Sequence, residues 1–294
     1  MTPFMSANLR DIAETVAPRS GWDFSRMKAE RDPGPWDYND VVRRFLRPTS
    51  QVLDIGTGGG ERFLAMADAF AFGLGLDLDP EMIRAAVNNR PSELSGRMSF
   101  AVMAAQPLAV RSGAFDLILN RHAPFAVTEV MRVLRPGGSF ITQQIGCHNM
   151  QNIFEAFGWA SSGAFWEKRR RQQRYETNAV ELAAEAFRHA GGTVVTLGTY
   201  DVGYYVHDLA SLLFWLQSVP LPEPFTIDRH EPAVRSLIER YQTPRGIASN
   251  EHRDLLIVQR SKGPEGNHHT FDLLADGAQD SRGARYAGRR VSHQ

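Results

Sequence analysis

The sequence is poor in cysteine, because Cys147 is the only one among 294 residues. No disulfide can form within the chain, so a reducing compartment is the simpler expectation and we predict a cytoplasmic protein. Clusters of cysteine and histidine with the spacing of a structural zinc site are also lacking, so we expect no metal.

An excess of charge is absent too. The chain has 33 basic and 33 acidic residues, which leaves no overall field to attract nucleic acid or an anionic membrane. The one dense basic run, Lys168–Arg171 with Arg174 close behind, is interpreted first as a solvated helix face, and otherwise as a contact for substrate or RNA. Nucleic acid is therefore not the expected partner.

Long apolar runs are missing as well. The apolar stretch Leu209–Leu216 is far too short to span a bilayer, and the first residues lack the apolar core of a signal peptide. A hydrophobic content of 43% and a charged content of 22% are ordinary for a soluble globular protein. The length suits one large α/β domain with elaborations, or two modest domains.

What the sequence does contain is a glycine-rich turn between two apolar runs, the second of which ends in Asp77. A dinucleotide site needs the pattern G-x-G-x-x-G, but neither Gly56 nor Gly58 is followed by a glycine five residues later. A phosphate-binding G-x-x-x-x-G-K-[ST] loop is also absent from the sequence. The pattern that does fit is an acid followed by three alternating glycines: Asp54, Gly56, Gly58 and Gly60.

Apolar runs and amphipathic segments alternate over the first half of the chain. This alternation predicts a parallel, doubly wound sheet with right-handed crossovers. The expected strands are residues 51–55, 72–76, 98–103, 115–119 and 139–145. The expected helices lie at 37–46, after Gly60, after Pro80 and at 124–134.

The pattern loosens beyond Gly146. Helices are predicted at 149–157, 165–175, 179–190, 208–219 and 232–241, and strands at 193–199 and 255–258. We expect five regions: an N-terminal helical cap (1–46), a main α/β domain (47–200), a helical insertion (201–250), the last strand of the main domain (251–260) and a disordered polar tail (261–294).

Four motifs in order resemble those of class I S-adenosylmethionine (SAM)-dependent methyltransferases. They are the glycine-rich turn after strand 51–55, Asp77 at the end of the second strand, Phe115–Leu119 and Val133–Gly138. The resemblance is strong over about residues 36–146 and implies a Rossmann-like, mostly parallel sheet of seven strands with an antiparallel last strand.

The resemblance also implies which residues bind SAM. Asp77 would accept hydrogen bonds from both ribose hydroxyls, and Asp54 would offset the ammonium and sulfonium charges. The helix after Gly60 would favour the methionine carboxylate. The full expected set is Asp54, Gly56, Thr57, Gly58, Gly60, Asp77, Leu78, Ala104, Ala105, Gln106 and Asn120. The product of the reaction would be S-adenosyl-L-homocysteine.

One position departs from the family pattern. Many members carry an acid after the third strand that binds the adenine amino group, and Ala104 stands there instead. Backbone groups of Ala104 and Ala105, or the amide of Gln106, are the alternatives, and the sequence does not choose among them.

A general base is needed only if the acceptor must lose a proton early. The candidate is His122, which follows the fourth strand and would titrate near neutrality, although a helix-start histidine is the simpler interpretation. Trp22, Tyr205 and His207 are candidates for contacting the acceptor, and His207 is also a weaker candidate for the base.

The absence of several motifs narrows the classes of molecule that could accept the methyl group. The sequence Asn120–Ala123 replaces the [DNS]-P-P-[YFW] motif of amino methylation, and neither a paired-glutamate loop nor a metal-binding acid set is seen. We therefore predict a SAM-dependent methyltransferase that acts on a small molecule. An RNA methyltransferase and a non-catalytic SAM-binding sensor or assembly protein are the alternatives. The sequence does not indicate the oligomeric state.

Overall fold

The computed structural model describes residues 8–17, 24–159 and 180–262. The expectations for Trp22, the basic run Lys168–Arg171, the helix at 165–175 and the tail beyond residue 262 fall outside these ranges. The chain divides into two compact units. Of the described residues, unit 1 holds 8–17, 24–34, 146–159 and 200–252, and unit 2 holds 35–145, 180–199 and 253–262. Most of the predicted N-terminal cap (1–46) and all of the predicted insertion (201–250) therefore belong to the same unit, unit 1.

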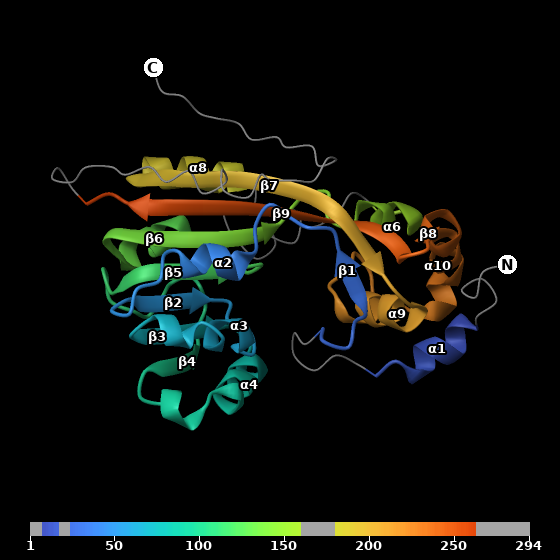
Figure 1. Cartoon of the computed structure of the whole chain (residues 1–294), viewed down its shortest axis with the longest axis horizontal. Helices are drawn as coiled ribbons and strands as arrows, with labels where there is room; N and C mark the ends of the chain where they lie inside the picture. Colours follow the sequence, from blue (N-terminus) through green and yellow to red (C-terminus); the bar gives the residue numbers. More distant parts are fainter. Residues whose placement is uncertain (1–7, 18–23, 160–179, 263–294) are drawn as a thin grey trace, which may run out of the picture. The chain divides into compact units, whose positions relative to one another are not determined.

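The described strands form one mixed sheet in the order β1-β7-β9-β6-β5-β2-β3-β4, and β8 pairs with β9 (Figure 1). The pairs β2–β3, β2–β5, β3–β4 and β5–β6 are parallel, and β9 runs antiparallel to β6. The bounds are β1 Ala29–Arg31, β2 Gln51–Ile55, β3 Phe72–Asp77, β4 Met98–Val102, β5 Phe115–Arg121, β6 Leu134–Ile145, β7 Gly192–Val206, β8 Gln242–Thr243 and β9 Gly246–Arg260.

The predicted doubly wound, mostly parallel sheet with an antiparallel last strand is confirmed. Its seven expected strands are β4, β3, β2, β5, β6, β9 and β7, and the short strands β1 and β8 extend the sheet to nine. The sequence did not reveal β1, because three residues are too few for a periodic pattern.

Strand β2 lies inside the sheet, paired on both sides. Its Val52 and Leu53 are fully buried and Ile55 is nearly so. A parallel strand covered on both faces needs this near-continuous apolar run, because neither face meets water. The buried strand delivers Asp54 and the glycine-rich turn to the carboxyl edge of the sheet.

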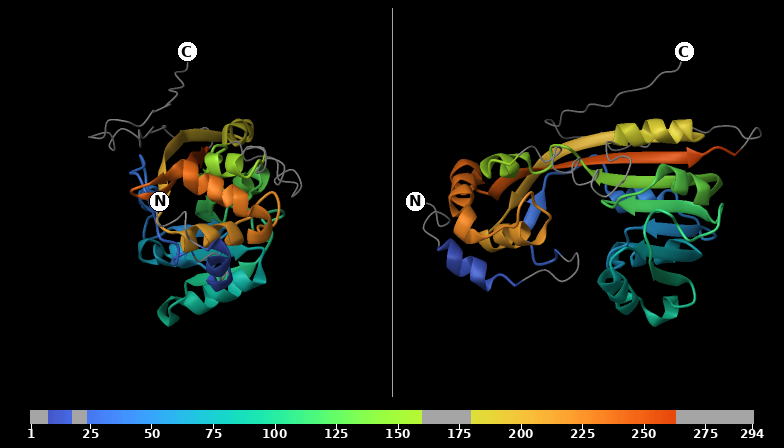
Figure 2. Two further views of the ribbon diagram at one scale, coloured as in Figure 1. Left: turned by 90° about the vertical axis from the view of Figure 1, so that its right-hand side faces the viewer. Right: turned by 180° about the vertical axis from the view of Figure 1, so that it is seen from behind.

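In unit 2, helices α5 (Val127–Val133) and α8 (Val180–His189) pack on one face of the sheet (Figure 2). The rings of Phe125 and Phe187 lie 4.9 Å and 5.3 Å from the ring of Phe140 on β6. Helices α2 (Tyr38–Arg43) and α4 (Pro80–Asn89) complete the long helices of this unit in the described ranges. Asp37 caps α2 and Asp79 caps α4, each by accepting hydrogen bonds from backbone amides of the first turn.

Unit 1 has its own apolar core. It is built from α1 (Leu9–Thr15), α6 (Gln151–Ala156), α9 (Leu209–Ser218) and α10 (Ile227–Tyr241). Leu212, Leu213, Val234, Leu237 and Ile238 are fully buried there. Helix α10 begins five residues before the predicted start, and Pro232 lies inside its second turn.

The helix expected after Gly60 is much shorter than predicted. Helix α3 spans only Glu61–Leu64, and a separate 3₁₀ turn covers Ala67–Ala69. Arginine side chains bind the carbonyls that a longer helix would use: Arg43 donates to Ala65, and Arg97 donates to Ala67 and Phe70. These are contacts between segments distant in sequence, so the local apolar spacing could not predict them.

Within the described ranges, each helix is too short or too polar to serve as a membrane span. The same residues contain no group of three or more metal-binding side chains close enough to hold an ion.

The aromatic contacts beneath α8 yield a stability prediction. Phe187 is fully buried, whereas Leu182 on the same helix is 59% exposed. We expect Phe187→Ala to lower the free energy of unfolding by about 3–5 kcal/mol, because it leaves a cavity against Phe140, and Leu182→Ala to change it by less than about 0.5 kcal/mol. Urea denaturation of both variants checks this, and equal losses would contradict the described packing.

Candidate cofactor site at the carboxyl edge of the sheet

The three alternating glycines all adopt left-handed backbone conformations. Their φ angles are 78° at Gly56, 57° at Gly58 and 78° at Gly60. Residues with a side chain rarely adopt such angles, so the alternation is a requirement of the turn itself. A side chain at Gly56 would also overlap the methyl group of Ala123, whereas the space beside Gly58 is open.

The turn is fixed to the end of β3 by its own backbone. The amides of Gly56 and Thr57 donate to the carbonyl of Leu76 at 2.8 and 2.9 Å. The amide of Gly58 donates to Oδ2 of Asp77 at 3.0 Å. The glycine turn and the end of the second parallel strand are therefore brought together, as the sequence predicts.

Asp77 is held from both sides. Its Oδ1 accepts the amide of Asp79 at 3.0 Å, and its Oδ2 accepts the amide of Gly58. A carboxylate has about four acceptor positions, so each oxygen keeps capacity for a further donor. The side chain is only partly buried. A fixed, accessible pair of acceptors suits a vicinal diol such as that of ribose.

Asp54 lies one residue before the end of β2 and behaves differently. Burial of its carboxyl group raises the pKa to about 7, the charge of Asp77 adds to this rise, and the charge of Arg121 opposes it. A buried acid beside another acid favours its neutral form. A bound cation would shift it toward the carboxylate, so this position is suited to a positively charged ligand group.

Two exposed apolar side chains flank Asp77. Leu78 follows it and is 66% exposed, and Val102 lies opposite Asp77 on β4 and is 51% exposed. Exposed leucine and valine beside a polar anchor can cover a flat apolar ring. The next residue on that side, Met103, donates its amide to the carbonyl of Asp77 at 2.9 Å. Ala104, Ala105 and Gln106 follow Met103 in the chain, and their contact with a cofactor stays a prediction.

Asn120, the last residue of the expected cofactor-binding set, has partners of its own. Its side chain is fully buried, and its Oδ1 accepts hydrogen bonds from Thr142 at 2.8 Å and Gln144 at 2.7 Å. Its Nδ2 donates to the carbonyl of Ile55 at 3.1 Å. Since these bonds join β5 to β2 and β6, the side chain stabilises the sheet at this edge, and its role in binding a cofactor stays a prediction.

His122 stands at the carboxyl edge as expected, with a φ of 58° that is unusual for a residue with a side chain. Its amide donates to the carbonyl of Gln143 at 2.9 Å. Its Nε2 is buried and makes no hydrogen bond with any residue in the described ranges. A polar ring atom in that position suits a ligand as its partner.

The expectation that His122 titrates near neutrality is wrong. Burial lowers its pKa well below the usual value, and the charges of Arg121, Arg253 and Arg62 lower it further. The imidazole is therefore neutral at physiological pH and is a weak base.

The proposed role of a helix N-terminus also needs correction. Helix α3 has only four residues, and its first turn carries the acid Glu61. A macrodipole needs several aligned peptide units, so this helix gives little attraction for a carboxylate.

Two candidates for acceptor contact lie in unit 1, where they have partners of their own. The guanidinium of Arg245 lies 3.7 Å from the ring centroid of Tyr205, and the Tyr205 hydroxyl donates to Asp32 at 3.4 Å. His207 Nε2 lies 3.6 Å from Glu30 Oε2. Their contact with an acceptor stays a prediction.

Arg253 is a site residue that the sequence did not reveal. It lies on β9 opposite Ile145, at the carboxyl end of β6, and is nine-tenths buried. Only the pairing of β6 with β9 brings it to this edge, across more than one hundred residues of sequence. Arg121, by contrast, adjoins His122 and could have been found as a flanking residue.

The glycine conformations predict different costs for the same substitution. Gly58→Ala is expected to lower the free energy of unfolding by about 1 kcal/mol, from left-handed backbone strain alone. Gly56→Ala adds an overlap with Ala123 and should cost roughly 1–3 kcal/mol more. Chemical denaturation measures both, and a Gly58→Ala variant as damaged as Gly56→Ala would contradict the close approach of the two loops.

The raised pKa of Asp54 predicts a pH-dependent cost. An acid whose pKa is higher in the folded state destabilises folding as pH rises above its unfolded pKa near 4, and the cost is complete above about 7. Asp54→Asn removes this cost. Its gain in unfolding free energy should therefore be roughly 2–3 kcal/mol larger at pH 8 than at pH 5. Thermal or urea unfolding at the two pH values tests this, and an equal gain at both would refute the buried-acid assignment.

Comparison with known proteins agrees with this geometry. A family model described as "Methyltransferase domain" matches residues 52–138. The phosphoethanolamine N-methyltransferase 2 of Caenorhabditis elegans is 27% identical over 125 residues, which is 39% of this chain and 29% of that protein. The 23S rRNA (guanine(748)-N(1))-methyltransferase of Streptomyces fradiae is 33% identical over 110 residues, 36% of this chain and 38% of that protein. The chain thus spans well under half the length of these relatives.

The fold is found in solved structures as well. The YcgJ protein of Bacillus subtilis superposes with a TM-score of 0.51 at 18% identity, covering 77% of this chain and 99% of that one. The glycine turn, the acid that ends β3 and the parallel strands β2 to β5 lie within or directly beside the matched residues 52–138. Residues 52–138 of this chain therefore match a methyltransferase domain, and the fold around them is shared with this solved structure.

Proposed function

We propose that this protein transfers a methyl group from SAM to a small organic acceptor. The observation that carries the proposal is the arrangement of two acids around the glycine turn. Asp77 is fixed by two backbone amides, while Asp54 is enclosed with a pKa of about 7. One acid suits a diol and the other suits a cation, and SAM contains both groups.

The residues present fit this cofactor. The open space beside Gly58 leaves room for a ligand against the backbone, and Asp77 keeps unused acceptor capacity. Leu78 and Val102 supply exposed apolar surface beside Asp77, where an adenine ring needs cover. When bound, SAM would supply a methyl group on a positively charged sulfur. That methyl group is readily transferred to a nucleophile placed opposite the sulfur.

The tasks left to the protein are to orient the acceptor and to exclude water. His122 is neutral, and its buried Nε2 can accept the proton of an acceptor hydroxyl or amine in a hydrogen bond. Such a bond aligns a nucleophile without removing its proton beforehand. We therefore propose His122 as an orienting group for the acceptor, in place of a strong general base.

The nature of the acceptor rests on weaker support. One relative is named for a small molecule, phosphoethanolamine, and another for a guanine of 23S rRNA. The balanced charge of the chain favours the small molecule, because binding RNA depends on neutralising phosphates. The exposed Cys147 agrees with the cytoplasmic location that we propose.

A binding and labelling experiment tests the proposal. SAM should bind the wild-type protein in titration calorimetry, and Asp77→Ala should weaken binding by roughly 10–100-fold through the loss of charged hydrogen bonds. Asp68→Ala, which removes an exposed acid of the same unit, is the matched control and should bind normally. With methyl-labelled SAM and cell extract, we expect label in the small-molecule fraction.

The alternatives give different outcomes in the same experiment. Label in RNA, together with a steep salt dependence of RNA binding, would establish the RNA enzyme instead. Tight SAM binding without any labelled product would favour a sensor or assembly role. No binding of SAM to the wild-type protein would refute all three.

A further inference from the structure

The segment Ala104–Pro107 is a short bridge between two fixed points in unit 2. Its first fixed point is Met103, whose amide donates to the carbonyl of Asp77 at 2.9 Å. The sulfur of Met103 in turn accepts the amide of Ala109 at 3.3 Å, beyond the far end of the bridge. The bridge therefore starts beside the carboxylate that we assign to the cofactor.

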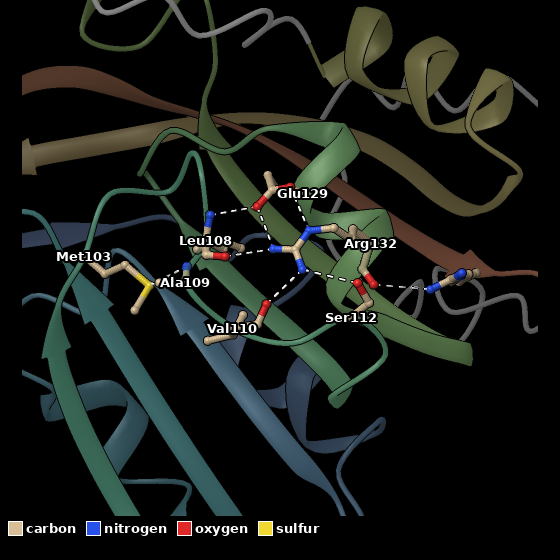
Figure 3. A network of polar contacts seen from close by, with 8 residues as sticks. Met103, Leu108, Ala109, Val110, Ser112, Glu129 and Arg132 are labelled. Carbon is tan, nitrogen blue, oxygen red and sulfur yellow. Dashed lines mark hydrogen bonds and ion pairs between the residues drawn. The ribbon is translucent and has the colours of Figure 1, made fainter.

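The second fixed point is a pair of charged side chains on α5 (Figure 3). Arg132 donates to the carbonyl of Leu108 at 2.8 Å and to the carbonyl of Val110 at 2.8 Å. It also donates to the hydroxyl of Ser112 at 3.3 Å. Glu129 accepts the amide of Leu108 at 2.7 Å. Both backbone groups of Leu108 are thus bound by one ion pair.

The pair itself is well formed. Arg132 Nε and Nη2 donate to the two oxygens of Glu129 at 2.8 Å each, in the two-pronged geometry that guanidinium and carboxylate share. The hydrogen bonds from Arg132, against some desolvation, hold the pKa of Glu129 below its usual value. The Glu129 side chain is only 15% exposed, so the pair is less screened by water than a surface ion pair.

The bridge Ala104–Pro107 has no charged side chain. Its residues are Ala-Ala-Gln-Pro, so the polar contacts they can offer come from the backbone and from Gln106. Backbone groups select a ligand only when the chain is held in place, because ordering a residue on binding costs roughly 1–2 kcal/mol. A bridge without its own charged anchor depends on the clamp at its end.

We infer that Glu129 and Arg132 are positioning residues for the nucleoside part of SAM, holding Ala104–Pro107 against the site without touching the cofactor. This inference rests on the proposed function, because SAM is the ligand that the bridge would meet.

The test compares two helix ion pairs of the same spacing. Arg132→Met removes the clamp, and Arg188→Met removes the pair Glu185–Arg188 on α8, whose distance is 2.7 Å. With the full chain, titration calorimetry should show SAM binding about tenfold weaker in Arg132→Met and unchanged in Arg188→Met. Amide hydrogen exchange should become faster across residues 103–112 in the first variant alone.

A kinetic readout separates positioning from general damage. At saturating SAM, kcat of Arg132→Met should stay within about twofold of wild type, while KM for SAM rises about tenfold. Arg132→Lys keeps the charge opposite Glu129 but cannot reach three acceptors at once. It should restore thermal stability without restoring SAM affinity, and Glu129→Gln, which keeps an acceptor for the Leu108 amide, should fall between the two.

Three other outcomes would refute either the inference or the proposed function. Wild-type SAM affinity in a folded Arg132→Met or Arg132→Lys variant refutes the inference and leaves the proposed function intact. Faster exchange at residues 103–112 without a change in SAM affinity also refutes it. Failure of the wild-type protein itself to bind SAM refutes the proposed function, and the inference with it.

Discussion

The end of strand β3 is the constraint on which the site depends. Two consecutive residues, Leu76 and Asp77, bind three separate segments. Their carbonyls accept the first amides of the glycine turn and the amide of Met103, and the Asp77 carboxylate accepts the amides of Gly58 and Asp79. The turn after β2, the entrance to α4 and the segment after β4 are all positioned from one place. A parallel sheet makes this possible, because its strands deliver their carboxyl ends to the same edge.

Burial disfavours the charged forms of two side chains at this edge of the sheet. Burial pushes the Asp54 carboxyl and the His122 imidazole toward their neutral forms, one by a raised pKa and the other by a lowered pKa. A ligand charge next to these two buried groups interacts with them more strongly than it would in bulk water, because the local dielectric constant is lower. The stability that the fold loses there is compensated by apolar layers such as the rings of Phe125, Phe140 and Phe187.

The features predicted correctly from the sequence are those that depend on neighbouring residues. The glycine spacing reflects three left-handed φ angles, Asp77 ends a strand by its own apolar pattern, and β2 begins and ends where the sequence predicts. The features that the sequence did not reveal depend on contacts across the fold. Arg43 binds the carbonyl of Ala65 just past the end of α3, Thr142 and Gln144 bind the side chain of Asn120, and Arg253 reaches the site only through strand pairing. Local spacing carries no information about such partners.

The contact between Gly56 and Ala123 has a consequence for how this edge can vary. The turn after β2 and the turn after β5 touch at two positions that carry almost no side-chain volume. Enlarging either residue would push the glycine turn away from the turn that carries His122. The side chain that fits at position 56 therefore depends on the side chain at position 123, and the reverse. A descendant of this sequence can keep these two turns in contact only while both positions stay small.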